Sequence, residues 1–213
     1  MEKISIPKYT LGEEIMNSVT HGIGAGLAIA GLVLLIIFSH SPIAIVSSAV
    51  FGSVMIILFT ISCIYHALSP NVAGKKVLRV IDHCNVILMV AGTYTPICLS
   101  LLGGALGWTM FGIVWGVTIV AIVFNAIDVD RFTFVTILCC LVVGWAGLFI
   151  IKPLINACGL GGLMWLLIGG LVYSTGAVLY CIGKRHRYIH SVFHLFVLGG
   201  SICHFFFILF YCI

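Results

Sequence analysis

Charged residues are scarce in this sequence. Only 8% of the 213 residues are Asp, Glu, Lys or Arg, whereas 62% are apolar. A soluble globular domain has about 25% charged residues because its surface faces water. Proline is scarce too, with 5 residues against 24 glycines, and no G-X-Y period is present. These shortages exclude a soluble globular domain, a collagen-like chain and a disordered polar chain, so an integral membrane protein remains.

The few charges are separated by long uncharged intervals. A membrane-spanning helix needs about 20 apolar residues. The intervals 15–74 and 83–127 are each long enough for two helices, divided near Ser39–Pro42 and near Gly103–Gly107, and three later intervals each fit one. The sequence therefore predicts an all-α integral membrane protein with seven transmembrane helices at 19–38, 43–66, 82–101, 106–126, 132–151, 161–182 and 190–211.

The basic residues lie mainly on one side of this topology. If the N-terminus is cytosolic, nine of the ten basic residues fall in inner segments and Lys152 alone falls in an outer one. Loops rich in Lys and Arg stay in the cytosol. We therefore expect a cytosolic N-terminus and a C-terminus outside. The nine inner residues are Lys3, Lys8, Lys75, Lys76, Arg79, Arg131, Lys184, Arg185 and Arg187.

The N-terminal residues lack the pattern of a cleavable signal peptide, because they are acidic and precede a long apolar run. Thr10 and Glu13 have the spacing of a capping box, which predicts a helix that begins near Leu11 and leads into the first span. We expect a single seven-helix transmembrane domain over residues 1–213. Within it, residues 1–18 would form a cytosolic segment with a short interfacial helix.

We interpret the cysteines and the glycine motifs as packing features of the predicted helices. The nine cysteines show no C-x-x-C motif and no framework spacing, so we interpret them as buried apolar side chains. Cys158 and Cys212 both fall near the outer face, where a pairing stays open. Two glycine motifs predict close helix packing, namely Gly22-x-x-x-Gly26 and Gly112-x-x-x-Gly116. No phosphate loop or basic stripe that would bind nucleic acid is present.

Polar residues converge at one predicted membrane depth. His66 ends the second predicted span, Asp82 begins the third, and His190 and His194 begin the seventh, all at the inner face. Ionisable groups inside spans are costly and usually functional. This convergence is the main functional signal in the sequence.

A pair of histidines separated by four positions predicts a metal site. His190 and His194 would lie on one helix face about 5–6 Å apart, and His66 would supply a third nitrogen from another helix. Three protein ligands with one open position are typical of catalytic zinc, and imidazole suits this metal. We expect Zn²⁺ at these three residues. The alternative is a set of capping and interhelical hydrogen bonds without metal.

Two further residues are candidates for catalysis. Asp82 would orient a ligand imidazole or a metal-bound water, or act as the general base. Ser62 precedes His66 by four positions and projects to the same helix face. Water on Zn²⁺ reaches a pKa near 7, so it becomes a nucleophile at neutral pH.

Other polar residues surround this predicted site. Glu13, Asn17 and His21 form an i, i+4, i+8 stripe, which is either an outer shell of the site or the interfacial entry of the first helix. His83 follows Asp82 but points about 100° away around the helix. It is a further outer-shell candidate.

Two more histidines have less specific surroundings. His186 lies among Lys184, Arg185 and Arg187, so we interpret it as a surface residue. His204 lies about 21 Å further along the seventh helix from His190. We interpret it as a packing residue, with a role in a proton or substrate path as the alternative.

The order of these motifs matches a known family. The matching elements are Glu13-x-x-x-Asn17-x-x-Thr20-His21-Gly22 before the first span, Ser62-x-x-x-His66 in the second, Asp82-His83 and Ala91-Gly92-Thr93-Tyr94-Thr95-Pro96 in the third, and His190-x-x-x-His194 with Gly200-Ser201 and His204 in the seventh. They cover nearly the whole length. The chain thus resembles the hemolysin III family, within the superfamily of progestin and adiponectin receptors.

The resemblance implies seven helices, a cytosolic N-terminus, and zinc held near the cytosolic face by three histidines that match His66, His190 and His194. It implies that Asp82 is an associated acidic group and that Ser62 neighbours the site. The eukaryotic receptors are similar to alkaline ceramidases, which hydrolyse lipid amides. Bacterial members are named for haemolysis and linked to membrane lipid or energy homeostasis. A multi-pass protein of a bacterial plasma membrane is therefore expected.

We weigh three functions. The first is a zinc-dependent hydrolase of a lipid amide or ester, similar to a ceramidase, with a role in membrane lipid homeostasis. The second is a receptor-like sensor with structural zinc, for which a membrane lipid is the ligand. The third is a transport or pore-forming protein with haemolytic activity, which is disfavoured because transporter sites usually lie at the midplane. Three-ligand zinc favours the hydrolase modestly over the sensor.

Overall fold

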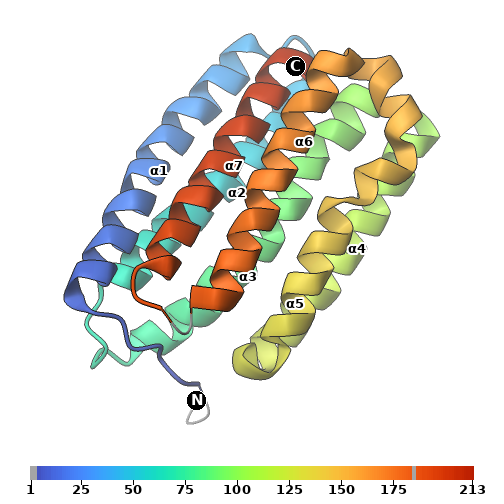
Figure 1. Ribbon diagram of the computed structural model, residues 1–213. Coiled ribbons are helices and arrows are strands. Elements are labelled where there is room, and N and C mark those ends of the chain that lie inside the picture. The colour runs from blue at the N-terminus through green and yellow to red at the C-terminus, as the bar shows by residue number, and fades with distance from the viewer. Residues whose placement is uncertain (1–3, 184–185) are drawn as a thin grey trace.

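The computed structural model describes residues 4–183 and 186–213 as an all-helical bundle (Figure 1). Lys3, Lys184 and Arg185, which we placed on the inner side, lie outside the described residues. The N- and C-termini lie at opposite ends of the bundle (Figure 1). The α-helices are α1 (Leu11–Phe38), α2 (Pro42–Ala67), α3 (Gly74–Pro96), α4 (Gly104–Ile127), α5 (Val129–Gly144), α6 (Ile151–Gly183) and α7 (Ile189–Tyr211).

Six helical stretches of the described residues are long and apolar enough to cross a membrane. The fifth of these is Val129–Gly183, 55 residues long. It joins α5 to α6 through a short 3₁₀ helix, η2 (Ala146–Ile150). The predicted spans 132–151 and 161–182 both fall within it. Figure 1 shows the stretch turning back on itself, so that α5 and most of α6 run in opposite directions.

Glycines mark the places where the chain bends. Gly103 and Gly104 have φ values of 60° and 54°, which a glycine adopts without the steric penalty of a side chain. They separate α4 from η1 (Ile97–Leu102), the π-helix that extends α3. This confirms the break predicted near Gly103–Gly107. A kink inside α6 at Gly159, with φ 65°, was not predicted.

The start of α1 follows the sequence prediction. The Thr10 hydroxyl accepts a hydrogen bond from the Glu13 amide, and the Glu13 carboxylate accepts one from the Thr10 amide, which completes the capping box. The helix then continues from Leu11 to Phe38 without a break. The short helix expected within residues 1–18 is thus the first part of α1 and is continuous with the first predicted span.

Helix α3 begins earlier than we predicted, at Gly74 rather than near residue 82. The first turns of α3 therefore carry Lys75 and Arg79, and both side chains are buried. Each is paired with a carboxylate, Lys75 with Glu14 and Arg79 with Asp130. Paired and hydrogen-bonded charges can be buried at a much lower cost than isolated ones. An uncharged-interval criterion could not place this helix start, because it assumes that charges lie outside the helices.

Of the four glycines in the predicted packing motifs, Gly22 alone lies at a helix contact among the described residues, since an added Cβ there would lie 3.4 Å from Cys63 Sγ of α2. Gly26, Gly112 and Gly116 are exposed, and an added Cβ at each would meet no atom within 4 Å. Gly24 instead makes the close contact of α1 with α2, where an added Cβ would lie 2.8 Å from the Phe59 ring. The prediction was wrong for Gly26, Gly112 and Gly116, because spacing alone does not tell which helix face is buried. All nine cysteines, Cys158 and Cys212 included, are free.

Candidate metal centre

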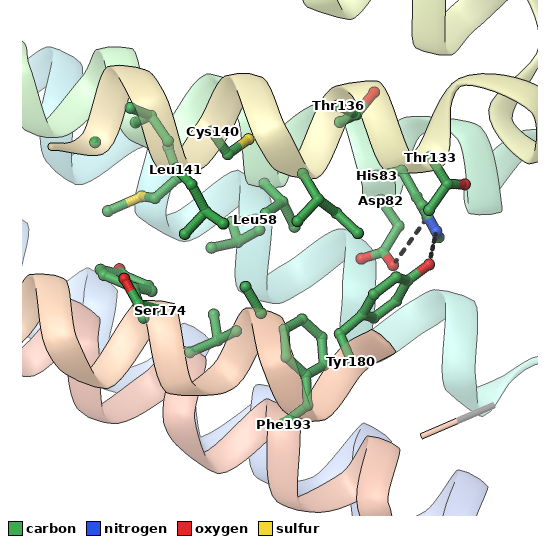
Figure 2. A pocket seen from close by; sticks show the side chains of 18 of the residues that line it. Leu58, Asp82, His83, Thr133, Thr136, Cys140, Leu141, Ser174, Tyr180 and Phe193 are labelled. Carbon is green, nitrogen blue, oxygen red and sulfur yellow. Dashed lines mark hydrogen bonds and ion pairs between the residues drawn. The ribbon is translucent and has the colours of Figure 1, made fainter. Parts of the chain in front are cut away.

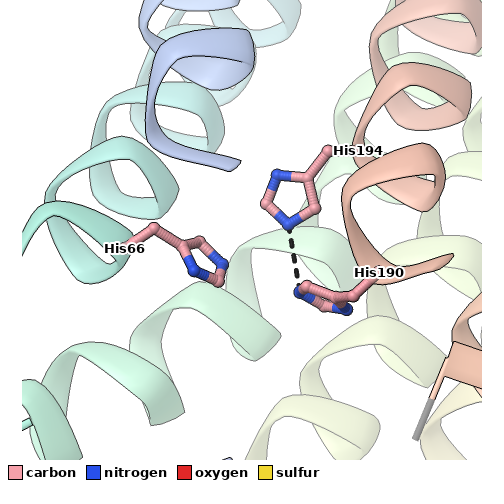
Figure 3. Close-up of side chains that lie close together, drawn as sticks. All are labelled: His66, His190 and His194. Carbon is pink, nitrogen blue, oxygen red and sulfur yellow. Dashed lines mark hydrogen bonds between the residues drawn. The ribbon is translucent and has the colours of Figure 1, made fainter. Parts of the chain in front are cut away.

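Three histidines from two helices meet at the end of the bundle nearest the N-terminus. His66 lies in the last turn of α2, and His190 and His194 lie in the first two turns of α7. One ring nitrogen of each lies within 4.8 Å of the others. The Nε2 atoms of His190 and His194 are 3.1 Å apart. Figure 3 shows the three rings directed toward a common centre.

His66 is oriented by a carboxylate. Its Nδ1 lies 2.6 Å from Glu14 Oε2, and the Asn17 side-chain amide lies 3.3 Å from the same nitrogen. Because a carboxylate can only accept, Nδ1 carries the proton and donates it to Glu14. In the tautomer with its proton on Nδ1, the ring has an unprotonated Nε2. This Nε2 atom is buried and has no hydrogen-bond partner among the described residues, so its lone pair is available to a ligand.

Lys75 completes this arrangement. Its Nζ donates to Glu14 Oε1 at 2.6 Å and to the Leu68 carbonyl at 2.7 Å. The ammonium also lies 5.2 Å from the centroid of the Tyr65 ring. Lys75 is fully buried, at 0% exposure. The pairing keeps Glu14 charged, which strengthens the hydrogen bond from His66.

A fourth histidine adjoins the cluster. The ring of His21 lies 3.9 Å from that of His194, centroid to centroid, and meets the edge of Phe59. Both nitrogens of His21 are buried without a hydrogen-bond partner among the described residues. The structure thus brings His21 into ring contact with the cluster, which is the position that one of the two interpretations of the stripe expects.

The N-terminal segment 4–10 covers the site. Tyr9 stacks on His190, with ring centroids 4.8 Å apart, and also contacts His66. Burial raises the pKa of the Tyr9 phenol well above its ordinary value. The segment is anchored by Ser5, whose amide and hydroxyl both donate to Asp130 and whose carbonyl accepts from Arg79. Tyr9 therefore covers the side of the histidine cluster that faces the N-terminal segment.

A cavity of about 190 Å³ extends from the cluster into the bundle (Figure 2). His190 and Tyr9 line one end of it, together with Asp82 and His83. The Asp82 carboxylate lies 3.9 Å from His83 Nδ1. His83 donates this Nδ1 proton to the Arg79 carbonyl, so its Nε2 accepts from the Tyr180 hydroxyl at 3.0 Å. Asp82 and His83 thus face the cavity beside the cluster and do not join the three rings.

Other predicted residues take different positions. Ser62 is buried one turn before His66 on α2 and is not among the cavity-lining residues. Glu13 caps α1 and accepts a hydrogen bond from the Tyr188 amide at 2.8 Å, so it ties α1 to the start of α7 and does not contact a histidine ring. His186 is exposed, as we expected. His204 lines the far end of the cavity.

Three residues around the cluster were not predicted from the sequence, namely Glu14, Lys75 and Tyr9. Glu14 had a recognisable signal, because the spacing from Glu14 to Asn17 and His21 is i, i+3, i+7, which also defines one helix face. We assigned the stripe to Glu13 instead. Lys75 and Tyr9 had no such signal, because their partners lie on other elements.

A family model described as Haemolysin-III related matches residues 9–205. The chain belongs to this family. The match extends from Tyr9 to beyond His204, so it includes every residue of the candidate site. This confirms the resemblance that the motifs indicated.

Curated relatives of this haemolysin III chain come from bacteria and mammals. The hemolysin-3 homolog of Bacillus subtilis is 41% identical over 96% of this chain and 97% of its own length. Hemolysin-3 of Bacillus cereus is 39% identical over 99% of this chain and 96% of its own. The human monocyte to macrophage differentiation factor is 25% identical over 93% and 84%. With its long apolar helices, the chain is a multi-pass membrane protein.

The pairing of Glu14 with Lys75 makes a prediction about stability. Lys75→Met should destabilise the protein by about 3–5 kcal/mol, because it leaves a mostly buried carboxylate without its cation. The double variant Glu14→Gln/Lys75→Met should recover part of this loss, since neither charge remains. Thermal unfolding of the purified protein in detergent measures both. Lys76→Met, at the less buried neighbouring lysine, is the matched control. Additive losses in the double variant would contradict the assigned pairing.

Proposed function

We propose that the protein is a zinc-dependent hydrolase that cleaves an amide or ester bond of a membrane lipid. The observation that carries the proposal is the convergence of three histidine nitrogens within 4.8 Å of one another, next to an apolar cavity that His190 lines. His66, His190 and His194 would hold the metal. A role in membrane lipid homeostasis follows from such an activity.

The donor set fits zinc. Two imidazole nitrogens bound to one tetrahedral zinc at about 2.0–2.1 Å lie roughly 3.3 Å apart, close to the 3.1 Å between the Nε2 atoms of His190 and His194. The orphaned Nε2 of His66 supplies the third lone pair. A ligand histidine that donates its other N–H to a carboxylate is the usual outer-shell arrangement of zinc sites, and Glu14 accepts this bond. Three histidines suffice as the protein ligands of such a zinc site, without a cysteine.

The cavity suits an apolar chain with a polar head. Apolar side chains such as Leu58, Leu141 and Phe193 line it along its length, and polar side chains including Asp82, His83 and Tyr180 gather at the end near the cluster (Figure 2). Contact between α5 and α6 is slight, and both helices line the cavity. A lipid would therefore enter from the bilayer between α5 and α6 and place its amide or ester at the histidines.

Asp82 would act first as the general base and then as the general acid. When bound, zinc supplies a Lewis acid and lowers the pKa of water. Asp82, on the cavity wall beside His190, would accept a proton from the attacking water and pass it to the departing amine or alcohol. The bond from water oxygen to the carbonyl carbon forms, and the C–N or C–O bond breaks. Tyr9, which covers the site, would limit entry of bulk water from the N-terminal end.

Lipid turnover tests this proposal. Wild type in nanodiscs should hydrolyse at least one of a panel of lipid amides and esters, and removal of zinc should abolish the activity. Asp82→Asn should lower kcat by about 10²–10⁴-fold and leave bound zinc unchanged. Asp128→Asn is the matched control, because Asp128 caps α5 away from the cavity and Asn preserves a cap. Zinc-loaded wild type that turns over no lipid would instead support a sensor with structural zinc.

The membrane topology is part of the same proposal. We propose seven crossings, with α5 and α6 as separate spans, a cytosolic N-terminus and an outer C-terminus, in a bacterial plasma membrane. The opposite positions of the two termini in Figure 1 support an odd number of crossings. The excess of Lys and Arg on the predicted inner side supports the direction. The histidine cluster would then lie near the cytosolic face.

Reporter fusions test the topology. Alkaline phosphatase fused after Ile213 should be active, because it would lie outside, and the same enzyme inserted after Asn71 in the α2–α3 loop should be inactive. Green fluorescent protein at the same two positions should give the opposite pattern. Six crossings with a cytosolic N-terminus would make the C-terminal phosphatase inactive, and this result would overturn the seven-span proposal.

A further inference from the structure

The far end of the cavity is polar. His204 lines it, 14 residues beyond His190 on α7, which corresponds to about 21 Å along the helix axis. Tyr173 and Ser174 of α6 and Trp145, between α5 and η2, line the same end. Figure 2 shows Ser174 at one end of the cavity, Asp82, His83 and Tyr180 at the other, and Leu58 between them. The cavity thus has two polar ends and an apolar middle.

The hydroxyl groups at this end of the cavity already donate hydrogen bonds within the protein. Ser201 Oγ donates to the Val197 carbonyl, so Tyr173 donates to Ser201 Oγ at 2.7 Å. Ser174 Oγ donates to the Gly170 carbonyl and accepts from Trp145 Nε1 at 3.0 Å. The oxygens of Tyr173 and Ser174 each keep an unused lone pair. They can therefore accept a hydrogen bond from a ligand.

The His204 ring can form one more hydrogen bond. Its Nδ1 is buried and has no hydrogen-bond partner among the described residues. The ring is held firmly, because it lies against the backbone of α6 at Gly169, where any added Cβ would collide with it. Tyr173 is positioned in the same way against Gly200, where an added Cβ would lie 2.7 Å from its ring. A buried polar atom without a partner is costly, so a ligand that supplies one gains affinity.

The group that fits is neutral. Among the described residues that line the cavity, the one carboxylate is Asp82, at the opposite end, and no Lys or Arg is present. An ionised group at this depth would have no counter-charge. A hydroxyl has one proton to donate and an oxygen that accepts. With the ring proton of His204 on Nδ1, the hydroxyl accepts from Nδ1 and donates its own proton to one of the two oxygens.

We propose that His204, Tyr173 and Ser174 form a second subsite, which binds a hydroxyl group on the acyl chain of the lipid. The inference rests on the proposed function to the extent that a lipid occupies this cavity. It adds a specificity: lipids hydroxylated along the acyl chain bind better than their unsubstituted parents. The apolar middle of the cavity would hold the methylene groups between the lipid head and the hydroxyl.

Direct binding tests the subsite independently of turnover. The probes are octadecanamide and a series of its derivatives with one hydroxyl at successive positions along the chain. Dissociation constants are measured for the full-length protein in nanodiscs. At one or two adjacent positions, the hydroxylated probe should bind wild type about two- to tenfold more tightly than its parent, the range expected for one additional hydrogen bond.

Variants assign the preference to this subsite. Tyr173→Phe, which keeps the packed ring, and His204→Leu should each reduce the preference and leave the affinity for octadecanamide within about twofold of wild type. His40→Leu is the matched control, because His40 is exposed and outside the cavity, and it should retain the preference. If His204→Leu fails to fold, Tyr173→Phe alone decides.

The outcomes separate the two proposals. Equal binding of all probes to wild type overturns the subsite and leaves the proposed function intact. A preference that persists in both variants overturns the subsite too, because the hydroxyl is then bound elsewhere. Failure of every probe to bind overturns both the subsite and the lipid-binding cavity. A preference lost in both variants, even without detectable hydrolysis, supports the subsite.

Discussion

The hydrogen bond from His66 to Glu14 is the interaction on which the site depends. It sets the tautomer of His66 and leaves Nε2 free to face His190 and His194. The bond joins α2 to α1, and Lys75 then joins both to α3 through the same carboxylate. Since His190 and His194 come from α7, four helices are fixed around one small volume. Loss of Glu14 would free the ring that completes the cluster.

The buried basic residues of α3 form ion pairs with carboxylates. A chain with only 8% charged residues still buries Lys75 and Arg79, each against a carboxylate from another element. Arg79 and Asp130 anchor the N-terminal segment, which places Tyr9 over His190. The apolar helices provide the scaffold, and the few ion pairs position the elements that surround the histidines. The polar ends of the cavity are likewise built from hydrogen-bonded side chains of different helices.

Local sequence patterns predicted what depends on local physics. Uncharged intervals located the apolar helices, the Thr10–Glu13 spacing located the start of α1, and the i, i+4 spacing of His190 and His194 placed two rings together, where His66 was expected to join them. Contacts between distant residues were harder. Nothing near Lys75 predicted its burial, because its partner Glu14 lies 61 positions away. The predictions for Gly26, Gly112 and Gly116 failed for a related reason, since the buried face of a helix is set by contact with its neighbours.

The central claim is that His66, His190 and His194 bind one zinc ion. X-ray absorption at the zinc K-edge of the purified protein tests it most directly. We expect about one zinc per chain, with three imidazole nitrogens, one oxygen ligand and no sulfur. Substitution of any of the three histidines by Ala should remove most of the metal, whereas His40→Ala should not. A protein without zinc, a sulfur ligand, or unchanged zinc in the three variants would contradict the assignment.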